Sequence, residues 1–150
     1  MTRARPLIAV VDDEESIRRA LQRLIRSAGL DVETFPSGSA FIDSVAAHPP
    51  DCLVLDLHMP GLSGFDVQAR LMHLTARLPV VVLTAHDSPE VRTRVMEAGA
   101  ASFLRKPVDD QVLLDAIASA IAGGSPPVNE KPSRNGTSKN PQESKRSTSS

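Results

Sequence analysis

Polar side chains follow four apolar runs of this sequence, each at the point where the run ends. The polar residues are Asp12 with Asp13, then Asp56, Thr84 and Lys106, and the runs that lead to them are LIAVV, LVL, VVVL and SFL. Each run has the length and composition of a buried strand. Because the carboxyl ends of parallel strands meet at one edge of a sheet, we expect three carboxylates, a hydroxyl and an ammonium to converge there.

Together these groups suit phosphoryl chemistry. Carboxylates only a few ångströms apart repel one another strongly unless a cation intervenes. Mg²⁺ suits such oxygen ligands and leaves room for waters and a phosphate oxygen. Asp56 precedes a turn at Pro60 and Gly61 and is the candidate reacting group, since a carboxylate can accept a phosphoryl group as an aspartyl phosphate. Mg²⁺, Lys106 and the Thr84 hydroxyl would neutralise the oxygens of the transferred group.

Each of these residues, taken alone, has a plainer interpretation. The acidic cluster DDEE that begins at Asp12 can start a helix and favour its dipole. Asp56 can initiate a turn or cap a helix, Lys106 can be a solvated lysine, and Thr84 can be a strand-end hydroxyl. Their occurrence in register at successive strand ends favours the site.

Strand-like and helix-like segments alternate along the chain. The expected strands are residues 7–11, 32–35, 52–55, 80–83 and 102–104, and each is followed by apolar residues at helical spacing, with Met72 and Met96 among them. Ser37, Ser88 and Asp109 are placed as helix N-caps. Strict alternation predicts an α/β fold, a doubly wound parallel sheet with helices on both faces.

Composition limits the classes of protein. With 150 residues, 41% of them hydrophobic, the chain can bury one core, and no apolar run approaches the ~20 residues of a membrane span. We therefore expect no membrane partner and no export signal. The single cysteine, Cys52, cannot form an internal disulfide, which favours a reducing cytoplasm.

Charge and composition divide the chain at its last predicted helix. Residues 123–150 hold five basic and two acidic side chains, a net +3, so residues 1–122 carry −4 of the total of −1. An acidic domain without Trp or Tyr argues against direct nucleic-acid binding. The segment 123–150 is too polar to bury a core and is predicted to be a disordered tail or linker.

The motifs resemble those of the receiver domain of two-component response regulators, over about Leu7 to Ala122. They are the acidic pair VVDDEE, the acceptor strand and turn LVLDLHMPGLSG, the hydroxyl motif LTA, and RKP. The segments LPVVVLTAH and EAGAASFLRKP are most similar to receivers of nitrogen-fixation-type regulators. The resemblance implies a flavodoxin-like sheet of strand order 2-1-3-4-5.

The resemblance also implies a metal and an acceptor. Asp56 would be the phosphoacceptor, and Mg²⁺ would be held by Asp13, Asp56 and the backbone carbonyl of His58, with Asp12 acting mainly through a bound water. The donor would be a histidine kinase or a phosphotransfer protein. Self-phosphorylation and slow self-dephosphorylation would be the only enzyme-like activities.

Further roles follow from the same resemblance. Thr84 would swing towards the phosphoryl group, Phe103 would follow as the switch aromatic, and Lys106 would bind a phosphoryl oxygen. The peptide bond between Lys106 and Pro107 would be cis. The fourth helix, fifth strand and fifth helix form the family's usual surface for an output partner, whose identity is unknown.

His58 and His86 lie two residues after Asp56 and Thr84, respectively. Although most histidines in loops are simply solvated, we hypothesise that these two border the phosphoryl site. They would then control how water reaches the acyl phosphate, and so its lifetime.

Three other interpretations stay open. Only 28 residues, most of them polar, follow the last predicted helix, against the roughly 60 of a helix-turn-helix domain, so no DNA-binding output is expected and the receiver would be free-standing, as a docking switch, a phosphate relay or a phosphate sink. The N-terminal part of a longer DNA-binding regulator would look the same, and a scaffold receiver is a further alternative. A phosphatase with an aspartyl nucleophile is disfavoured, because Leu57 and His58 occupy the positions where a second acid would be expected.

Overall fold

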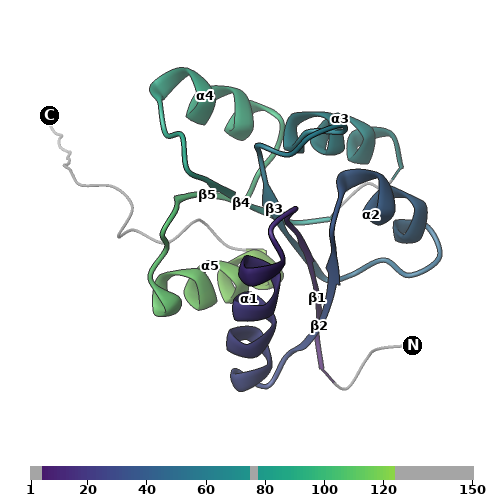
Figure 1. The fold of residues 1–150 in the computed structure, drawn as a ribbon, viewed down its shortest axis with the longest axis vertical. Coiled ribbons are helices and arrows are strands. Elements are labelled where there is room, and N and C mark those ends of the chain that lie inside the picture. Colours follow the sequence, from purple (N-terminus) through teal and green to yellow (C-terminus); the bar gives the residue numbers. More distant parts are fainter. Residues whose placement is uncertain (1–4, 75–77, 124–150) are drawn as a thin grey trace, which may run out of the picture.

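The computed structural model describes residues 5–74 and 78–123, in which five strands alternate with five helices (Figure 1). The strands are β1 (Leu7–Val11), β2 (Asp31–Phe35), β3 (Cys52–Asp56), β4 (Val80–Thr84) and β5 (Ser102–Arg105). The helices are α1 (Glu15–Ser27), α2 (Gly38–Val45), α3 (Gly64–Leu74), α4 (Pro89–Glu97) and α5 (Asp110–Ala122). The predicted alternation is confirmed, and β3 and β4 each extend by one residue to include Asp56 and Thr84.

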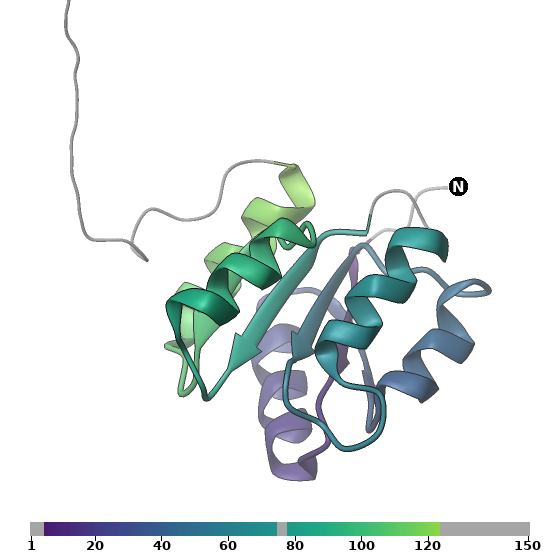
Figure 2. The same ribbon diagram turned by 90° about the horizontal axis from the view of Figure 1, so that it is seen from above.

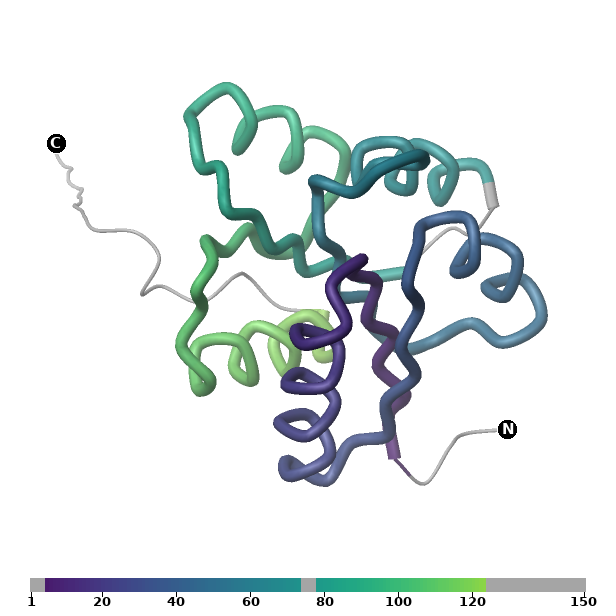
Figure 3. The backbone as a smooth tube through the Cα atoms, viewed as in Figure 1, coloured from purple at the N-terminus to yellow at the C-terminus, as the bar shows by residue number. Residues whose placement is uncertain are grey.

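The strands form one parallel sheet in the order β2-β1-β3-β4-β5, which confirms the predicted topology. Figures 1 and 2 show helices on both faces, and the trace in Figure 3 follows the crossovers. Helices α1 and α5 pack on one face, whereas α2, α3 and α4 pack on the other. Because every crossover returns the chain to the same end of the sheet, all carboxyl ends of the strands lie along one edge.

The two faces of the sheet have separate apolar cores. Side chains alternate along each strand, so Ile8 and Val10 join the core under α1 and α5, while Ala9 and Val11 join the core under α2, α3 and α4. All residues of β3 and β4 are buried, as expected for central strands of a doubly wound sheet. Cys52 belongs to the core under α1 and α5. Burial raises the pKa of its thiol to about 12, so the thiol stays protonated and contributes only to packing.

The predicted helix caps are present. The Ser37 and Ser88 hydroxyls accept backbone hydrogen bonds at the starts of α2 and α4, and the Asp109 carboxylate accepts two at the start of α5. Gly123 ends α5 with a φ of 77°, a left-handed conformation that favours glycine. The tail predicted for residues 123–150 lies outside the described residues apart from Gly123.

Two residues predicted on apolar helix faces are exposed instead. Met72 in α3 is 68% exposed and Met96 in α4 is 37% exposed. In each helix the preceding residue, Leu71 or Val95, is the buried one. A step of one residue turns the side chain by about 100° around the helix, which carries the methionine away from the sheet.

None of the helices in the described part of the chain is both long and apolar enough to cross a membrane.

Candidate functional site

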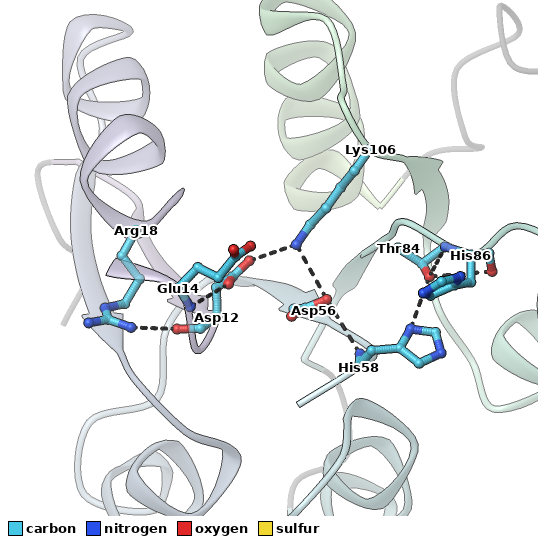
Figure 4. Close-up of polar contacts among 8 residues, drawn as sticks. All are labelled: Asp12, Glu14, Arg18, Asp56, His58, Thr84, His86 and Lys106. Atoms are coloured by element: carbon cyan, nitrogen blue, oxygen red, sulfur yellow. Dashed lines mark hydrogen bonds and ion pairs between the residues drawn. The ribbon is translucent and has the colours of Figure 1, made fainter. Parts of the chain in front are cut away.

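The carboxyl ends of β1, β3, β4 and β5 bring the predicted polar residues together (Figure 4). The strand register pairs Val11 with Leu55, Asp56 with Leu83, and Thr84 with Arg105. The residues that end or follow these strands therefore lie at one level. They were widely separated in the sequence, and the parallel crossovers alone account for their meeting.

Three carboxylates form the centre of the site. Asp12, Asp13 and Asp56 each place one carboxylate oxygen within 4.8 Å of the others. Asp12 and Asp56 are buried, with 1% and 6% of their surface exposed, whereas Asp13 is exposed. The cluster therefore has a buried floor and one side open to water.

Lys106 supplies a positive charge to this cluster. Its Nζ atom lies 2.9 Å from Asp12 Oδ2 and 3.4 Å from Asp56 Oδ1. Burial alone would lower the pKa of Lys106, but the hydrogen bond and charge of Asp12, together with Asp56, outweigh it and raise the pKa. The side chain therefore remains an ammonium ion, and it bridges the two buried carboxylates.

One ammonium does not neutralise the site. Burial, followed by the negative charge of Asp12, raises the pKa of Asp56 from 3.8 to about 6, although Lys106 and the His58 backbone N–H act in the opposite direction. An Asp with such a pKa carries a charge that the surrounding protein compensates only in part. Three carboxylate oxygens around one point and an opening to water fit a hard cation such as Mg²⁺.

Asp12 contributes both to the turn that leads into α1 and to the carboxylate cluster. Its Oδ1 atom accepts a hydrogen bond from the Glu14 backbone N–H at 2.9 Å, and its backbone carbonyl accepts one from Arg18 at 2.8 Å. These bonds fix the turn into α1, while Oδ2 remains directed at Lys106. The carboxylate thus stabilises the turn that precedes the helix and also lines the site.

Thr84 lies beside the acidic cluster with its hydroxyl bonded to two histidine residues. The side chain is fully buried. Its Oγ1 atom accepts a hydrogen bond from the His86 backbone N–H at 3.0 Å and lies 3.3 Å from His58 Nδ1. The rings of His58 and His86 meet edge to face, with centroids 4.8 Å apart. The two histidines expected near the phosphoryl site therefore contact each other and Thr84.

Thr84 and Lys106 are also joined through the backbone. The Lys106 N–H donates a 2.8 Å hydrogen bond to the Thr84 carbonyl, next to the last residues of β4 and β5. The following peptide bond, Lys106–Pro107, is cis, as the resemblance implied. The hydroxyl and the ammonium of the site are thus carried by directly bonded strand ends.

Phe103, the predicted switch aromatic, lies inside the protein. It is 1% exposed and belongs to the core beneath α2, α3 and α4. The guanidinium carbon of Arg92 in α4 lies 4.7 Å from the centre of the Phe103 ring. This cation–π contact connects the residue to α4, and the sequence pattern did not predict it.

Residues 8–118 match the sequence profile described as "Response regulator receiver domain". The chain belongs to this family. The geometry of the site agrees with the assignment, since the matched region contains every residue that meets at the sheet edge. Receiver domains in general are signalling domains rather than enzymes, and phosphorylation-dependent signalling is their standard function.

Regulators of the predicted type are among the relatives of this receiver. It is 42% identical over 114 residues to nodulation protein W of Bradyrhizobium diazoefficiens, an alignment that covers 76% of this chain and 50% of that protein. It is 34% identical over 114 residues to the transcriptional regulatory protein FixJ of Azorhizobium caulinodans, with 76% and 54% covered. The chain spans about half the length of the curated relatives it matches.

A solved structure shares the fold. The response regulator receiver protein from Burkholderia phymatum is 41% identical to this receiver, with a TM-score of 0.68. The match covers 83% of this chain and all of that one. The flavodoxin-like arrangement is therefore common to both.

Gly64 is a residue of the receiver site that the sequence analysis did not single out. It opens α3, and a Cβ atom at this position would lie 2.6 Å from the Asp56 carbonyl oxygen and 2.7 Å from Leu57 Cα. Glycine therefore lets α3 begin directly against the backbone of Asp56 and Leu57. The motif PGLSG contained the signal, but only the packing shows what the last glycine contacts.

Proposed function

We propose that this receiver accepts a phosphoryl group on Asp56 from a histidine kinase or a phosphotransfer protein, and that the modification changes which partner it binds. One observation supports this most directly. The Asp56 carboxylate, buried at the sheet edge, has an ammonium ion 3.4 Å from Oδ1 and two further carboxylates beside it. The groups that would serve as acceptor, charge-neutralising lysine and metal ligands thus lie within one small volume.

The metal would be Mg²⁺, held by Asp13, Asp56 and the His58 backbone carbonyl, with Asp12 acting through a water molecule. When bound, it would neutralise oxygens of the incoming phosphoryl group. The openness of the site on the Asp13 side supports this assignment, because Mg²⁺ in proteins usually keeps several waters.

In the transfer step, a carboxylate oxygen of Asp56 would attack phosphorus while the bond from phosphorus to the donor imidazole nitrogen breaks. The imidazole leaves with the bonding electron pair and takes up a proton from water. Lys106 would exchange its contact with Asp56 for one with a phosphoryl oxygen, and it could do so without leaving Asp12. Thr84 would turn its hydroxyl towards the same group, and Phe103 would follow.

Hydrolysis of the acyl phosphate by water would return the receiver to its resting state. The output partner is expected on the face formed by α4, β5 and α5, where Arg92 already contacts Phe103. Residence in the cytoplasm and the boundary of the domain near residue 122 remain predictions.

The test is the intact mass of the protein after incubation with acetyl phosphate and Mg²⁺. We expect a single phosphoryl adduct, which disappears when EDTA replaces Mg²⁺ and in the variant Asp56→Asn. The exposed carboxylate of Asp115 in α5 provides a matched control, because Asp115→Asn should form the adduct normally. An adduct that persists in Asp56→Asn would contradict the assignment of the acceptor. A folded protein that binds Mg²⁺ and forms no adduct would instead favour a scaffold role or a need for its own kinase.

A further inference from the structure

The Thr84 hydroxyl is held by contacts that it must leave before it can bind a phosphoryl group. In the described chain its hydrogen-bond partners are the His86 backbone N–H at 3.0 Å, the His86 carbonyl at 3.4 Å and His58 Nδ1 at 3.3 Å. Figure 4 shows His58 and His86 together at the Thr84 side of Asp56. The hydroxyl of Thr84, the last residue of β4, is therefore occupied by hydrogen bonds to the two histidines.

We infer that the His58 side chain is a latch that holds Thr84 in the resting position and so opposes the phosphorylated state. The inference rests on the proposed function, because the latch matters only if Thr84 moves when Asp56 is modified. His58 would be a positioning residue that acts through Thr84.

The hydrogen bonding of a hydroxyl explains why the contact opposes switching. Thr84 Oγ1 has one proton to donate and already accepts from the His86 N–H. If His58 Nδ1 accepts, it takes the hydroxyl proton that a phosphoryl oxygen would need. If Nδ1 instead donates, it occupies a lone pair and orients the hydroxyl. In both tautomers the Thr84–His58 contact must break before the hydroxyl turns.

The His86 ring packs against the His58 ring and helps to position it. The two imidazoles come from different loops, after β3 and after β4, and pack edge to face at an angle of 76°. Both rings are exposed to solvent, and their contact restricts the movement of the His58 ring, which helps to keep Nδ1 near the hydroxyl. His86 thus contributes twice, through its backbone to Thr84 and through its ring to His58.

The experiment measures the affinity of the full chain for beryllium fluoride, an analogue of the acyl phosphate, at saturating Mg²⁺. Because one partly exposed hydrogen bond contributes only modestly, His58→Ala should bind the analogue about threefold more tightly. His58→Asn, which can keep a nitrogen or oxygen atom near the Nδ1 position, should restore most of the wild-type value. The exposed His48 provides the control His48→Ala, for which we expect no change.

A double-mutant cycle separates the latch from a general effect of the histidine. In the background of Thr84→Ala, His58→Ala should no longer change the affinity, because the group on which it acts is missing. An equal gain in both backgrounds, or no gain in the Thr84-containing protein, would overturn the latch while leaving the proposed function intact.

NMR of the free protein gives a test that needs no ligand. The Thr84 χ1 angle should be fixed in the wild-type protein and averaged among rotamers in His58→Ala. A Thr84 side chain that stays equally fixed in both would overturn the latch. Failure of the wild-type protein to bind beryllium fluoride would instead overturn the proposed function and the latch that rests on it.

Discussion

Lys106 donates a 2.9 Å hydrogen bond to Asp12, a residue 94 positions earlier in the chain. The contact joins the end of β5 to the end of β1, with β3 and β4 between them in the sheet. It therefore spans the whole site and places an ammonium ion 3.4 Å from Asp56 Oδ1.

The first prediction concerns this ammonium ion. Lys106→Met keeps most of the aliphatic chain but leaves the buried Asp12 and Asp56 without their counter-charge. We expect the metal-free protein to lose about 2 kcal/mol of unfolding free energy. Urea denaturation in EDTA would measure the loss, and Mg²⁺ should restore part of it by substituting for the missing charge.

A surface ion pair provides the control for that experiment. Arg19 and Glu15 lie 2.8 Å apart on α1, but their side chains are 69% and 65% exposed. Arg19→Met should therefore cost well under 1 kcal/mol. Equal losses in the two variants would show that Lys106 contributes no more than a solvated lysine.

The second prediction is a dependence of stability on pH. The pKa of Asp56 is about 6 in the fold against an ordinary value of 3.8, so its charge is disfavoured by folding. This group therefore lowers stability as the pH rises from about 4 to about 6, and the cost is fully present above that range. Asp56→Asn removes the charge and should stabilise the metal-free protein at pH 8 by about 1–3 kcal/mol.

The measurement is thermal or urea unfolding of both proteins in EDTA between pH 4 and pH 8. The advantage of Asp56→Asn should shrink towards zero at the acidic end, where the native carboxyl is itself neutral. An advantage that is constant with pH would mean that something other than the charge of Asp56 is responsible.

The third prediction tests the close approach of α3 to the end of β3, where Asp56 lies. In Gly64→Ala the new methyl group would meet the backbone of Asp56 and Leu57, which cannot move without shifting the carboxylate. We expect a loss of about 2 kcal/mol or more and weaker Mg²⁺ binding, measured by urea denaturation and by titration with the metal.

Gly38→Ala is the matched comparison. There the nearest atom, at 2.7 Å, is a methyl group of Val67, and the Leu62 carbonyl follows at 3.0 Å. The Asp56 backbone is not involved, so any loss of stability should leave Mg²⁺ affinity nearly unchanged. Weakened Mg²⁺ binding in both variants alike would contradict a specific role for Gly64.

The fourth prediction concerns the lifetime of the phosphorylated state and rests on the proposed function. His58 and His86 are exposed and contact each other, and His58 contacts the buried Thr84 hydroxyl, so His86→Ala should admit water more readily to the acyl phosphate. We expect both His58→Ala and His86→Ala to raise the dephosphorylation rate by more than about twofold, or about 0.4 kcal/mol in the barrier. The decay of the phosphoryl adduct by intact mass would measure it, with His48→Ala as control. Rates within about twofold of wild type in both variants would show that the pair does not control water access.

The sheet and the residues at its edge could be predicted from the sequence because the signals are local and strong. Uninterrupted runs such as VVVL are typical of buried parallel strands, and Ser88 followed by Pro89 is typical of a helix start. Once strands and helices alternate, right-handed crossovers determine that Asp56, Thr84 and Lys106 share one edge.

Other features depend on packing that no local pattern contains. Helical spacing did not reveal that Met72 and Met96 lie outside the buried stripe. Gln68, a polar residue in α3, is buried and donates a 3.2 Å hydrogen bond to the Val95 carbonyl in α4, while its Oε1 atom has no hydrogen-bond partner among the described residues. The contact of Arg92 with Phe103 is likewise a product of how α4 lies on the sheet.

The backbone hydrogen bond from Lys106 to Thr84 gives the molecule a reporter of its own. Amide proton chemical shifts are sensitive to the length of the hydrogen bond. The amide of Lys106 is hydrogen-bonded to the carbonyl of Thr84, so it reports on both site residues. Any displacement of β4 relative to β5 at the site must stretch or shorten it. The Lys106 amide resonance, observed without a dye or a tag, would therefore record any change in the spacing of β4 and β5 that accompanies the proposed phosphorylation of Asp56.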